Sequence, residues 1–471
     1  MRVCIREFFC SVGCNLANAG HIFYNDGRTG RKEIEMTDKK KEKPKKAGTH
    51  GRRQIRWDKL DNTANLFPVI AGDDMTNVYR IAVTLTEEIQ PEILQQALDI
   101  VLPKFDGFNV RLRRGVFWYY FEENGKPAPK VVEETNFPCR FIQANRNHSY
   151  MFRVTYYHKR INLEVFHVLT DGMGGLNFIR ELTYQYLRLV HPQIKAEDNL
   201  SHMTSLNRED SFVKNFKRGK ASGFSKERAY LIRKERLPQG EFGIIHGYMP
   251  VSGLKEVAHR YGTSINEYLV AVFAWSTYQD CLKGMPSKLP IRVAVPVNLR
   301  PYFNSVTTKN FFCMVSAEFH PTKDSYTFEE VVEIIKESLH KQITKEHLED
   351  LFSYSVSNQQ NVFLRAVPLP IKNLVMKLVY TKSALANTTT ITNIGNIKVD
   401  EAYEPYIDSF HAFIAMSKGQ SLKGTVCSYG DDLVFTFSSI FADTGVQGTF
   451  FRKIAEDGVA VRVETNGVYY E

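Results

Sequence analysis

Short runs of alternating apolar and polar residues recur along the chain, and such alternation predicts half-buried β-strands. The clearest run covers residues 160–166 (RINLEVF), which also contain β-branched side chains. Further strand-like runs lie at residues 109–114, 150–156, 292–297, 313–318 and 433–438. The pattern therefore predicts strands spread over most of the chain.

Other segments place apolar residues three and four positions apart, as on one face of an α-helix. Residues 177–190 show this spacing directly after the 160–166 run and a glycine-rich turn, which predicts a strand, a tight loop and a helix in succession. Residues 91–102 and 265–282 have the same helical spacing. The tight loop before residue 177 is where the candidate chemistry lies.

That loop carries a histidine and an aspartate four residues apart, in the sequence His167-Val168-Leu169-Thr170-Asp171-Gly172. An imidazole at a strand end can take a proton from a hydroxyl, amine or thiol, because its unperturbed pKa is near the working pH range. Asp171 either contacts the histidine or turns to a cation and holds the loop in shape. The alternative for His167 is a structural histidine satisfied by a neighbouring carbonyl, since short motifs also occur by chance.

Further segments place this loop in a known context. They are residues 57–62 (WDKLDN), 115–120 (GVFWYY), 164–167 (EVFH), 293–301 (VAVPVNLRP), 310–312 (NFF) and 390–397 (TITNIGNI). With these segments and the H-x-x-x-D-G motif, the chain from about residue 55 onward resembles the chloramphenicol acetyltransferase-like superfamily. That group includes nonribosomal peptide condensation domains, and within it the chain is most similar to bacterial alcohol acetyltransferase-related proteins.

The resemblance implies an α/β fold with mixed sheets. It further implies two chloramphenicol acetyltransferase-like subdomains that form a pseudo-dimeric V around a central cleft or tunnel. The first subdomain is expected at residues 55–192 and the second at residues 240–471, joined by a polar surface linker at residues 193–239. The cations of this linker are interpreted as a solvated surface, and the alternative is that they meet the phosphates of coenzyme A.

The resemblance also implies roles for single residues. The motif histidine is the general base in relatives, so His167 is expected to deprotonate the acceptor, while Asp171 pairs with Arg300 in a structural role. Such a pair makes physical sense, because a desolvated carboxylate is costly unless it is paired and hydrogen-bonded, and a guanidinium does both. Gly172 suits a loop that needs a close backbone approach or a left-handed turn.

Other candidate residues carry weaker signals. Asn298, Thr392 and Asn393 are candidates for substrate binding, the last two for stabilising an oxyanion, although turn chemistry before Gly395 also explains them. Many relatives have a second histidine where this chain has Phe166, but the histidine that is kept is the catalytic one. The plant-type Asp-Phe-Gly-Trp-Gly element is absent, which argues against a plant-type pocket. No metal site and no bound cofactor are predicted.

Positive charge is concentrated near the N-terminal end. The chain has 471 residues, of which 43% are hydrophobic, and a formal net charge of +9. Residues 1–54 contain the tract KKKEKPKK and are expected to form a disordered basic extension; Met36 is an alternative start that would exclude residues 1–35 from the native protein. Lysine-rich tails are common solubilising segments, and no nucleic-acid module is recognised.

Two further patterns bear on location. Seven cysteines without paired metal spacing favour reduced thiols and a cytoplasmic protein. Residues 368–382 form an amphipathic helix, for which packing on a sheet is preferred to lying on a membrane. Stable membrane insertion is not expected.

These observations predict a cytoplasmic acyltransferase that uses an acyl-coenzyme A, with acetyl-CoA the first choice, and an alcohol or amine acceptor. Transfer would be direct, with His167 as the base and no covalent enzyme intermediate. One alternative is a condensation-type module that takes its acyl group from a carrier protein. The other is a non-catalytic scaffold that keeps the fold, against which the intact His167, Asp171, Gly172 and Arg300 argue.

Overall fold

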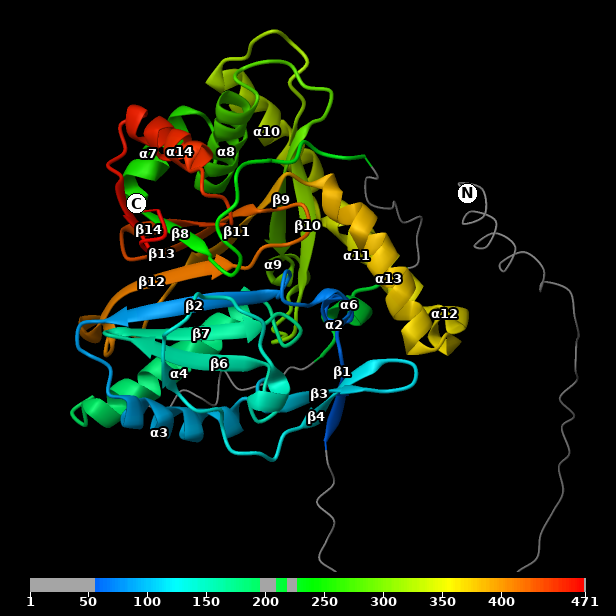
Figure 1. Cartoon of the computed structure of the whole chain (residues 1–471), viewed down its shortest axis with the longest axis vertical. Helices are drawn as coiled ribbons and strands as arrows, with labels where there is room; N and C mark the ends of the chain where they lie inside the picture. Colours follow the sequence, from blue (N-terminus) through cyan, green and yellow to red (C-terminus); the bar gives the residue numbers. More distant parts are fainter. Residues whose placement is uncertain (1–55, 195–208, 218–226, 470–471) are drawn as a thin grey trace, which may run out of the picture. The chain divides into compact units, whose positions relative to one another are not determined.

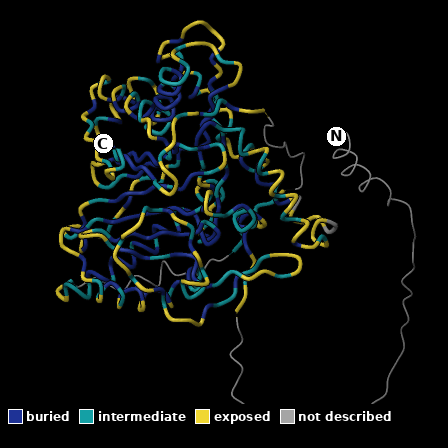
Figure 2. The backbone as a smooth tube through the Cα atoms, in the orientation of Figure 1, coloured by how far each residue is buried: buried dark blue, intermediate teal, exposed yellow. Residues whose placement is uncertain are grey.

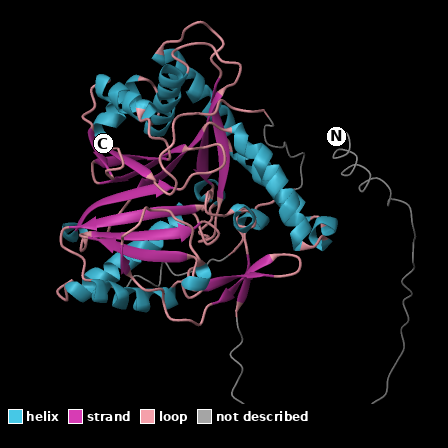
Figure 3. Cartoon of the chain, in the orientation of Figure 1, coloured by secondary structure: helices cyan, strands magenta, loops and turns pink. Residues whose placement is uncertain are grey.

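The computed structural model describes residues 56–194, 209–217 and 227–469, whose strands form three sheets (Figures 1 and 3). The expected basic extension at residues 1–54 and much of the linker lie outside the described residues. The described residues belong to a single compact unit. The α/β class with mixed sheets, predicted from the resemblance, is confirmed.

A five-stranded sheet contains the strand that ends at His167. In spatial order its strands are β12 (Ile407–Ile414), β2 (Val78–Leu85), β7 (Arg160–Phe166), β6 (Phe152–Tyr157) and β5 (Val132–Glu133). The edge strand β12 pairs antiparallel with β2, although its residues belong to the segment expected for the second subdomain. The two expected halves of the chain therefore share this sheet rather than dividing cleanly near residue 240.

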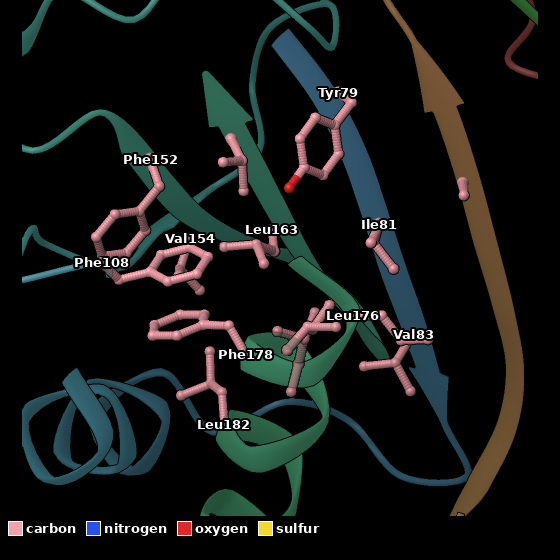
Figure 4. Packing of buried hydrophobic residues seen from close by; sticks show 14 of the residues in the cluster. Tyr79, Ile81, Val83, Phe108, Phe152, Val154, Leu163, Leu176, Phe178 and Leu182 are labelled. Carbon is pink, nitrogen blue, oxygen red and sulfur yellow. The ribbon is translucent and has the colours of Figure 1, made fainter. Parts of the chain in front are cut away.

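Helix α4 (Gly172–Val190) packs on β2 and β7, and α3 (Pro91–Val101) packs beside it (Figure 4). The apolar face of α4 includes Leu176, Phe178 and Leu182, and the Phe178 ring stacks on Phe108 with 4.0 Å between ring centroids. Three glycines at its start weaken the first turn, because glycine loses more backbone entropy in a helix than any other residue. Tertiary packing of the apolar face therefore stabilises this helix more than local propensity does.

The seven-stranded sheet forms the second layer. Its spatial order is β10 (Phe312–Phe319), β9 (Ile291–Asn298), β11 (Thr389–Asn396), β13 (Leu422–Tyr429), β14 (Asp432–Ser439), β8 (Gly243–Pro250) and β15 (Arg462–Thr465). Strand β11 runs parallel to both of its neighbours, whereas the other pairs are antiparallel. The combination makes this a mixed sheet, as expected.

Four helices accompany the second sheet: α7 (Val251–Arg260), α8 (Ile265–Cys281), α10 (Phe328–Gln342) and α14 (Gly445–Glu456). Helix α8 packs against α7, α10, α14 and β9, and its residues 268–274 are all buried. A capping box of Ser264 and Glu267 defines its first turn. An apolar helix of this kind is stable because neighbouring elements cover it on several sides.

The remaining elements lie around the two large sheets. They are the three-stranded sheet β1 (Trp57–Lys59), β4 (Tyr119–Glu123) and β3 (Val110–Arg114), and the helices α2 (Phe67–Ile70), α6 (Ser211–Lys214), α9 (Arg300–Phe303), α11 (Lys345–Gln360), α12 (Val362–Ala366) and α13 (Leu369–Ser383).

Two local expectations need correction. The described part of the 193–239 segment is not only surface, because Phe212 and Ala229 are buried and the Phe212 ring meets Phe311 at 4.9 Å. Isolated apolar residues in a polar run can still pack into the core, and Phe212 does so from the short helix at Ser211–Lys214. Helix α13 exposes its apolar stripe instead of packing it on a sheet. Leu369 is the one buried residue among the described residues of this helix.

Candidate active site

His167 lies immediately after β7, at the point where the strand gives way to the loop. Its backbone N–H donates to the Asn77 carbonyl at 3.0 Å, which holds the residue beside the end of β2. Phe67 of α2 stacks on the imidazole with 4.8 Å between ring centroids, and Tyr79 meets it edge-on at 5.1 Å. The ring is thus held in place by aromatic neighbours and remains partly exposed.

One nitrogen of the imidazole is tied to a hydrogen-bond relay. The Nδ1 atom of His167 lies 3.1 Å from Oδ1 of Asn310, whose Nδ2 donates to Oδ2 of Asp61 at 2.9 Å. The backbone N–H of Asn310 donates to the same carboxylate oxygen, and that of Ala64 donates to Asp61 Oδ1 at 2.7 Å. The relay therefore runs from Asp61 through Asn310 to His167.

This relay defines the tautomer of His167. Because Asp61 accepts from Asn310 Nδ2, the amide oxygen of Asn310 faces the imidazole, and an amide oxygen only accepts hydrogen bonds. Nδ1 of His167 must then carry the proton and donate it, which leaves Nε2 with a free lone pair. Within the part of the chain that the structure describes, Nε2 has no hydrogen-bond partner.

Burial shifts the pKa of both ends of the relay. The pKa of His167 is lowered by desolvation, against the opposing effect of Asp171, and nearby Lys423 lowers it further. The pKa of Asp61 is raised by burial to about 7, because the hydrogen bonds from Asn310 and Ala64 offset only part of its desolvation. At neutral pH the imidazole is therefore the uncharged form, which is the form that accepts a proton.

Asp171 faces away from the imidazole and toward a cation. Arg300 donates from NH1 to its Oδ2 at 2.8 Å and from NH2 to its Oδ1 at 3.1 Å, a bidentate arrangement. Backbone N–H groups of Gly174 and Phe311 also donate to the carboxylate. Arg300 in turn donates to the carbonyls of Thr307 and Lys309. The pair ties the loop after β7 to the segment that leads into β10.

At the start of α4, the steric demand for glycine lies later than the motif glycine. Gly172 does not have a positive φ, and a side chain there would meet only Ile394 at an ordinary 3.8 Å, so neither expected reason applies to it. A Cβ at Gly174 would overlap the Thr170 hydroxyl, and one at Gly175 would overlap Tyr79. Both neighbours are themselves hydrogen-bonded, Thr170 to Thr308 and Tyr79 to Asp171. They cannot move aside freely.

The weaker candidates occupy different places. Asn298 is exposed, and its side-chain oxygen accepts from the backbone N–H and from NH1 of Arg300, at 3.1 and 3.3 Å. Asn393 is exposed and accepts from the Gly395 N–H at 2.8 Å, where β11 makes a bulge. Thr392 is partly buried in the same strand, two residues before the Ile394 side chain that lies near Gly172. Asn298 thus stays with the ion pair, while the Thr-Asn pair lies on the strand that borders the loop.

A pocket opens beside the motif loop. It is lined by Thr170, Gly174, Thr308, Lys309 and the ring of Phe108, together with Phe105, Gly107, Phe121, Leu169 and Asn177. His167 does not line it, so this pocket reaches the loop from the side of Thr170 rather than from the imidazole.

The sequence patterns assigned no role to Asp61 or Asn310. Both lie in segments that carry the resemblance, but 249 residues separate them, and neither belongs to the H-x-x-x-D-G motif. The available signal is modest: Asp61 is a carboxylate that directly follows Leu60, and Asn310 is the last polar residue before an apolar strand. Only the folded chain brings them to the same imidazole.

Comparisons with known proteins agree on the fold. No family model and no curated protein matches the chain. Polyketide synthase associated protein 5 from Mycobacterium tuberculosis is similar over 84% of this chain and 96% of its own, with a TM-score of 0.56 and 13% identity. Trichothecene 15-O-acetyltransferase from Fusarium sporotrichioides covers 88% of this chain and 97% of its own, with a TM-score of 0.55 and 11% identity.

The first condensation domain of the calcium-dependent antibiotic synthetase gives a similar result. It covers 86% of this chain and 99% of its own, with a TM-score of 0.54 and 12% identity. The chain thus has the fold of condensation domains and of an O-acetyltransferase, and the fold expected from the superfamily resemblance is confirmed. At these identities the comparison concerns the fold alone.

Proposed function

We propose that the protein transfers an acyl group from a thioester to the hydroxyl or amine of a small acceptor, with His167 as the general base. The observation that carries the proposal is the hydrogen bonding of His167: Nδ1 lies 3.1 Å from Oδ1 of Asn310, which accepts its proton and leaves the Nε2 lone pair free on a partly exposed ring. The fold shared with an O-acetyltransferase and with condensation domains supports it by analogy.

The proposed reaction is a direct transfer. Nε2 of His167 removes the acceptor proton while the acceptor oxygen attacks the thioester carbonyl, and the tetrahedral intermediate then expels the thiolate. The imidazolium returns the proton to the thiolate sulfur, so that ester and free thiol are formed and the base is regenerated. A base of this kind typically contributes about 10²- to 10⁴-fold to the rate.

The lowered pKa of His167 suits both halves of this cycle. Because burial disfavours the imidazolium, the neutral base predominates at physiological pH. The same effect makes the imidazolium a ready acid when the thiolate leaves. Asp171 does not take part in proton transfer in this scheme, since Arg300 and two backbone N–H groups occupy its carboxylate.

Acyl-coenzyme A, with acetyl-CoA first, is the proposed donor and an alcohol the proposed acceptor, in the cytoplasm. Asn298, Thr392 and Asn393 stay proposed substrate contacts. The second candidate is a carrier-protein thioester as donor, because condensation domains share the fold to the same extent as the acetyltransferase. The two donors differ only in what carries the thiol, so one assay separates them.

The test follows free thiol release from purified protein. Acetyl-CoA and an acetylated carrier protein are each offered with a panel of alcohols and amines. His167→Ala is compared with His158→Ala, which removes an exposed histidine elsewhere in the fold. We expect acceptor-dependent release that falls by roughly 10²-fold or more in His167→Ala and is unchanged in His158→Ala.

The outcomes separate the candidates. Release from acetyl-CoA supports the coenzyme A enzyme, and release only from the carrier protein supports the condensation-type module. If no donor and acceptor pair gives release above the His167→Ala level, the proposed activity is wrong and the non-catalytic scaffold is preferred.

A further inference from the structure

An ordinary surface helix turns its apolar side chains toward the protein, whereas helix α13 exposes them to solvent. Its residues Ile371, Leu374, Val375, Leu378 and Val379 recur at helical spacing and form one apolar stripe, yet each of them is between 42% and 62% exposed. Figure 2 shows exposed and intermediate positions alternating along this helix. The stripe therefore faces away from the protein.

The side of α13 that faces the protein is the more polar one. Asn373 donates to the Tyr119 hydroxyl at 2.9 Å, and the Tyr380 hydroxyl lies 3.1 Å from Met75 Sδ. Lys372 donates to the carbonyls of Phe117 and Arg365. These contacts anchor the helix by hydrogen bonds and leave its apolar stripe without cover in the described residues.

A second exposed apolar segment adjoins the helix. The turn between β3 and β4 presents Val116, Phe117 and Trp118, which are 38% to 68% exposed. It is joined to the start of α13, because the Leu369 N–H donates to the Val116 carbonyl at 2.8 Å. The stripe of α13 and residues 116–118 together form what we call the α13 surface.

The charged side chains of helix α13 itself have one sign. Residues 369–383 contain Lys372, Lys377 and Lys382 and not a single carboxylate. Arg365 precedes the helix, and Arg114 ends the strand before the aromatic turn. Apolar side chains with lysines and an exposed tryptophan at one surface match the interface of a bilayer that contains anionic lipids.

We propose that the α13 surface docks the protein on the surface of a membrane that carries anionic lipids. The apolar stripe and Trp118 would enter the boundary between headgroups and acyl chains, and Lys377 and Lys382 would meet lipid phosphates. None of the described helices has the length and apolar character needed to cross a bilayer. The contact is therefore peripheral and reversible.

Charge also argues against a second copy of the chain as the occupant. Two identical α13 surfaces would bring lysine against lysine, with no carboxylate in the helix to neutralise them. An anionic bilayer instead compensates the charges of Lys377 and Lys382.

The docking surface is linked to the His167 site. Tyr380 of α13 contacts Met75, and the same loop supplies the Asn77 carbonyl that accepts from the His167 N–H. If the proposed acyl transfer holds, on which this extension rests, a docked enzyme would draw its acceptor from lipophilic alcohols dissolved in the bilayer.

The test measures contact of Trp118 with lipid in the full-length protein. Vesicles of phosphatidylcholine with roughly 30% phosphatidylserine, which gives the negative surface potential of an anionic leaflet, are prepared with and without brominated acyl chains that quench tryptophan at short range. We expect quenching that is lost in Trp118→Phe and kept in Trp57→Phe, which removes another exposed tryptophan. This readout does not depend on any activity, so its failure is distinct from failure of the proposed reaction.

Matched variants test the apolar stripe. Leu374→Glu/Leu378→Glu changes two exposed residues, so folding is unaffected, and vesicle binding should weaken at least about tenfold. Met285→Glu, at an equally exposed apolar residue outside the α13 surface, should bind as the wild type does. Lys377→Glu/Lys382→Glu should reduce binding to anionic vesicles and remove most of its salt dependence.

Two results would overturn the proposal. The first is vesicle binding that is equal in the wild type and in Leu374→Glu/Leu378→Glu, without quenching of Trp118, as binding through the basic N-terminal tract would give. The second is a dimer in sedimentation experiments that the same double variant dissociates, with no quenching by lipid, because a second copy would then cover the surface.

Discussion

Two buried aspartates flank His167, and their surroundings differ in one respect. Asp171 receives a bidentate guanidinium from Arg300, whereas the relay donors to Asp61 are the uncharged N–H groups of Ala64 and Asn310. Burial accordingly raises the pKa of Asp61 to about 7. Asp171 holds two segments together, and Asp61 orients an amide.

The comparison separates a structural carboxylate from a positioning one. A carboxylate paired with a guanidinium stabilises the contact between the two segments that the pair joins. A carboxylate held by uncharged donors instead fixes the orientation of the groups that donate to it. The motif aspartate is therefore not the one that orients the His167 imidazole. The following predictions test this division of roles.

The largest effect is expected from Arg300→Leu. It leaves the Asp171 carboxylate buried with only backbone donors, which typically costs about 3–5 kcal/mol. Urea unfolding should show this loss. The double variant Asp171→Leu/Arg300→Leu should be more stable than Arg300→Leu, since it removes the unpaired charge; equal stabilities would mean that the pair does not hold the loop.

Asp61→Ala should lower kcat/KM by about 10²-fold, within the range that a general base contributes. Without the carboxylate, the Asn310 amide loses its shorter hydrogen bond, and Nδ2 keeps only the longer one to the His167 carbonyl at 3.4 Å. The amide can then turn its NH2 toward Nδ1 of His167, and the proton moves to Nε2, where it blocks base action. Nitrogen NMR of His167 reports the tautomer directly.

A matched variant at the same position separates the relay from general damage. Asp61→Asn keeps an oxygen that can accept from Asn310, so it should lose less activity than Asp61→Ala and retain more of the original tautomer. An unchanged tautomer with full activity in Asp61→Ala would remove Asp61 from the relay.

The glycines in the first turn of α4 should differ in their response to alanine. Gly175→Ala forces a side chain against Tyr79, which is held by its hydrogen bond to Asp171, and overpacking of this kind costs about 1–3 kcal/mol. Gly172→Ala should cost less than about 1 kcal/mol, because its site has an ordinary φ and room for a methyl group. Thermal unfolding of the two variants measures the difference; equal losses would contradict it.

A further expected effect is a pH dependence of stability. The pKa of Asp61 is raised in the folded protein from 3.8 to about 7, so its contribution is complete below about pH 3.8 and is lost as the pH rises through 7. The slope is at most ~1.4 kcal/mol per pH unit. Comparing urea unfolding of the wild type and Asp61→Asn at about pH 5 and pH 7 isolates it, and parallel pH profiles would mean that Asp61 is ionised throughout.

Periodicity was sufficient for the secondary structure around the site. Alternation in residues 160–166 and helical spacing in 177–190 predicted β7 and α4, because the sheet and helix repeats depend on neighbouring residues only. The expected turn at the glycines is wrong, because Gly172, Gly174 and Gly175 already form the first turn of α4 and the loop covers only residues 167–171. The motif and the resemblance then named His167, Asp171 and Arg300 as candidates.

The local sequence pattern did not predict contacts between residues that lie far apart in the chain. The pairing of β12 with β2 and the relay from Asp61 to Asn310 join residues hundreds of positions apart, and no periodicity links such positions. The same limit applies to α13, whose amphipathic pattern predicted an apolar stripe but not that it faces outward. A sequence encodes which faces are apolar and which groups can donate or accept, whereas the packing of distant segments assigns each face its cover and each group its partner.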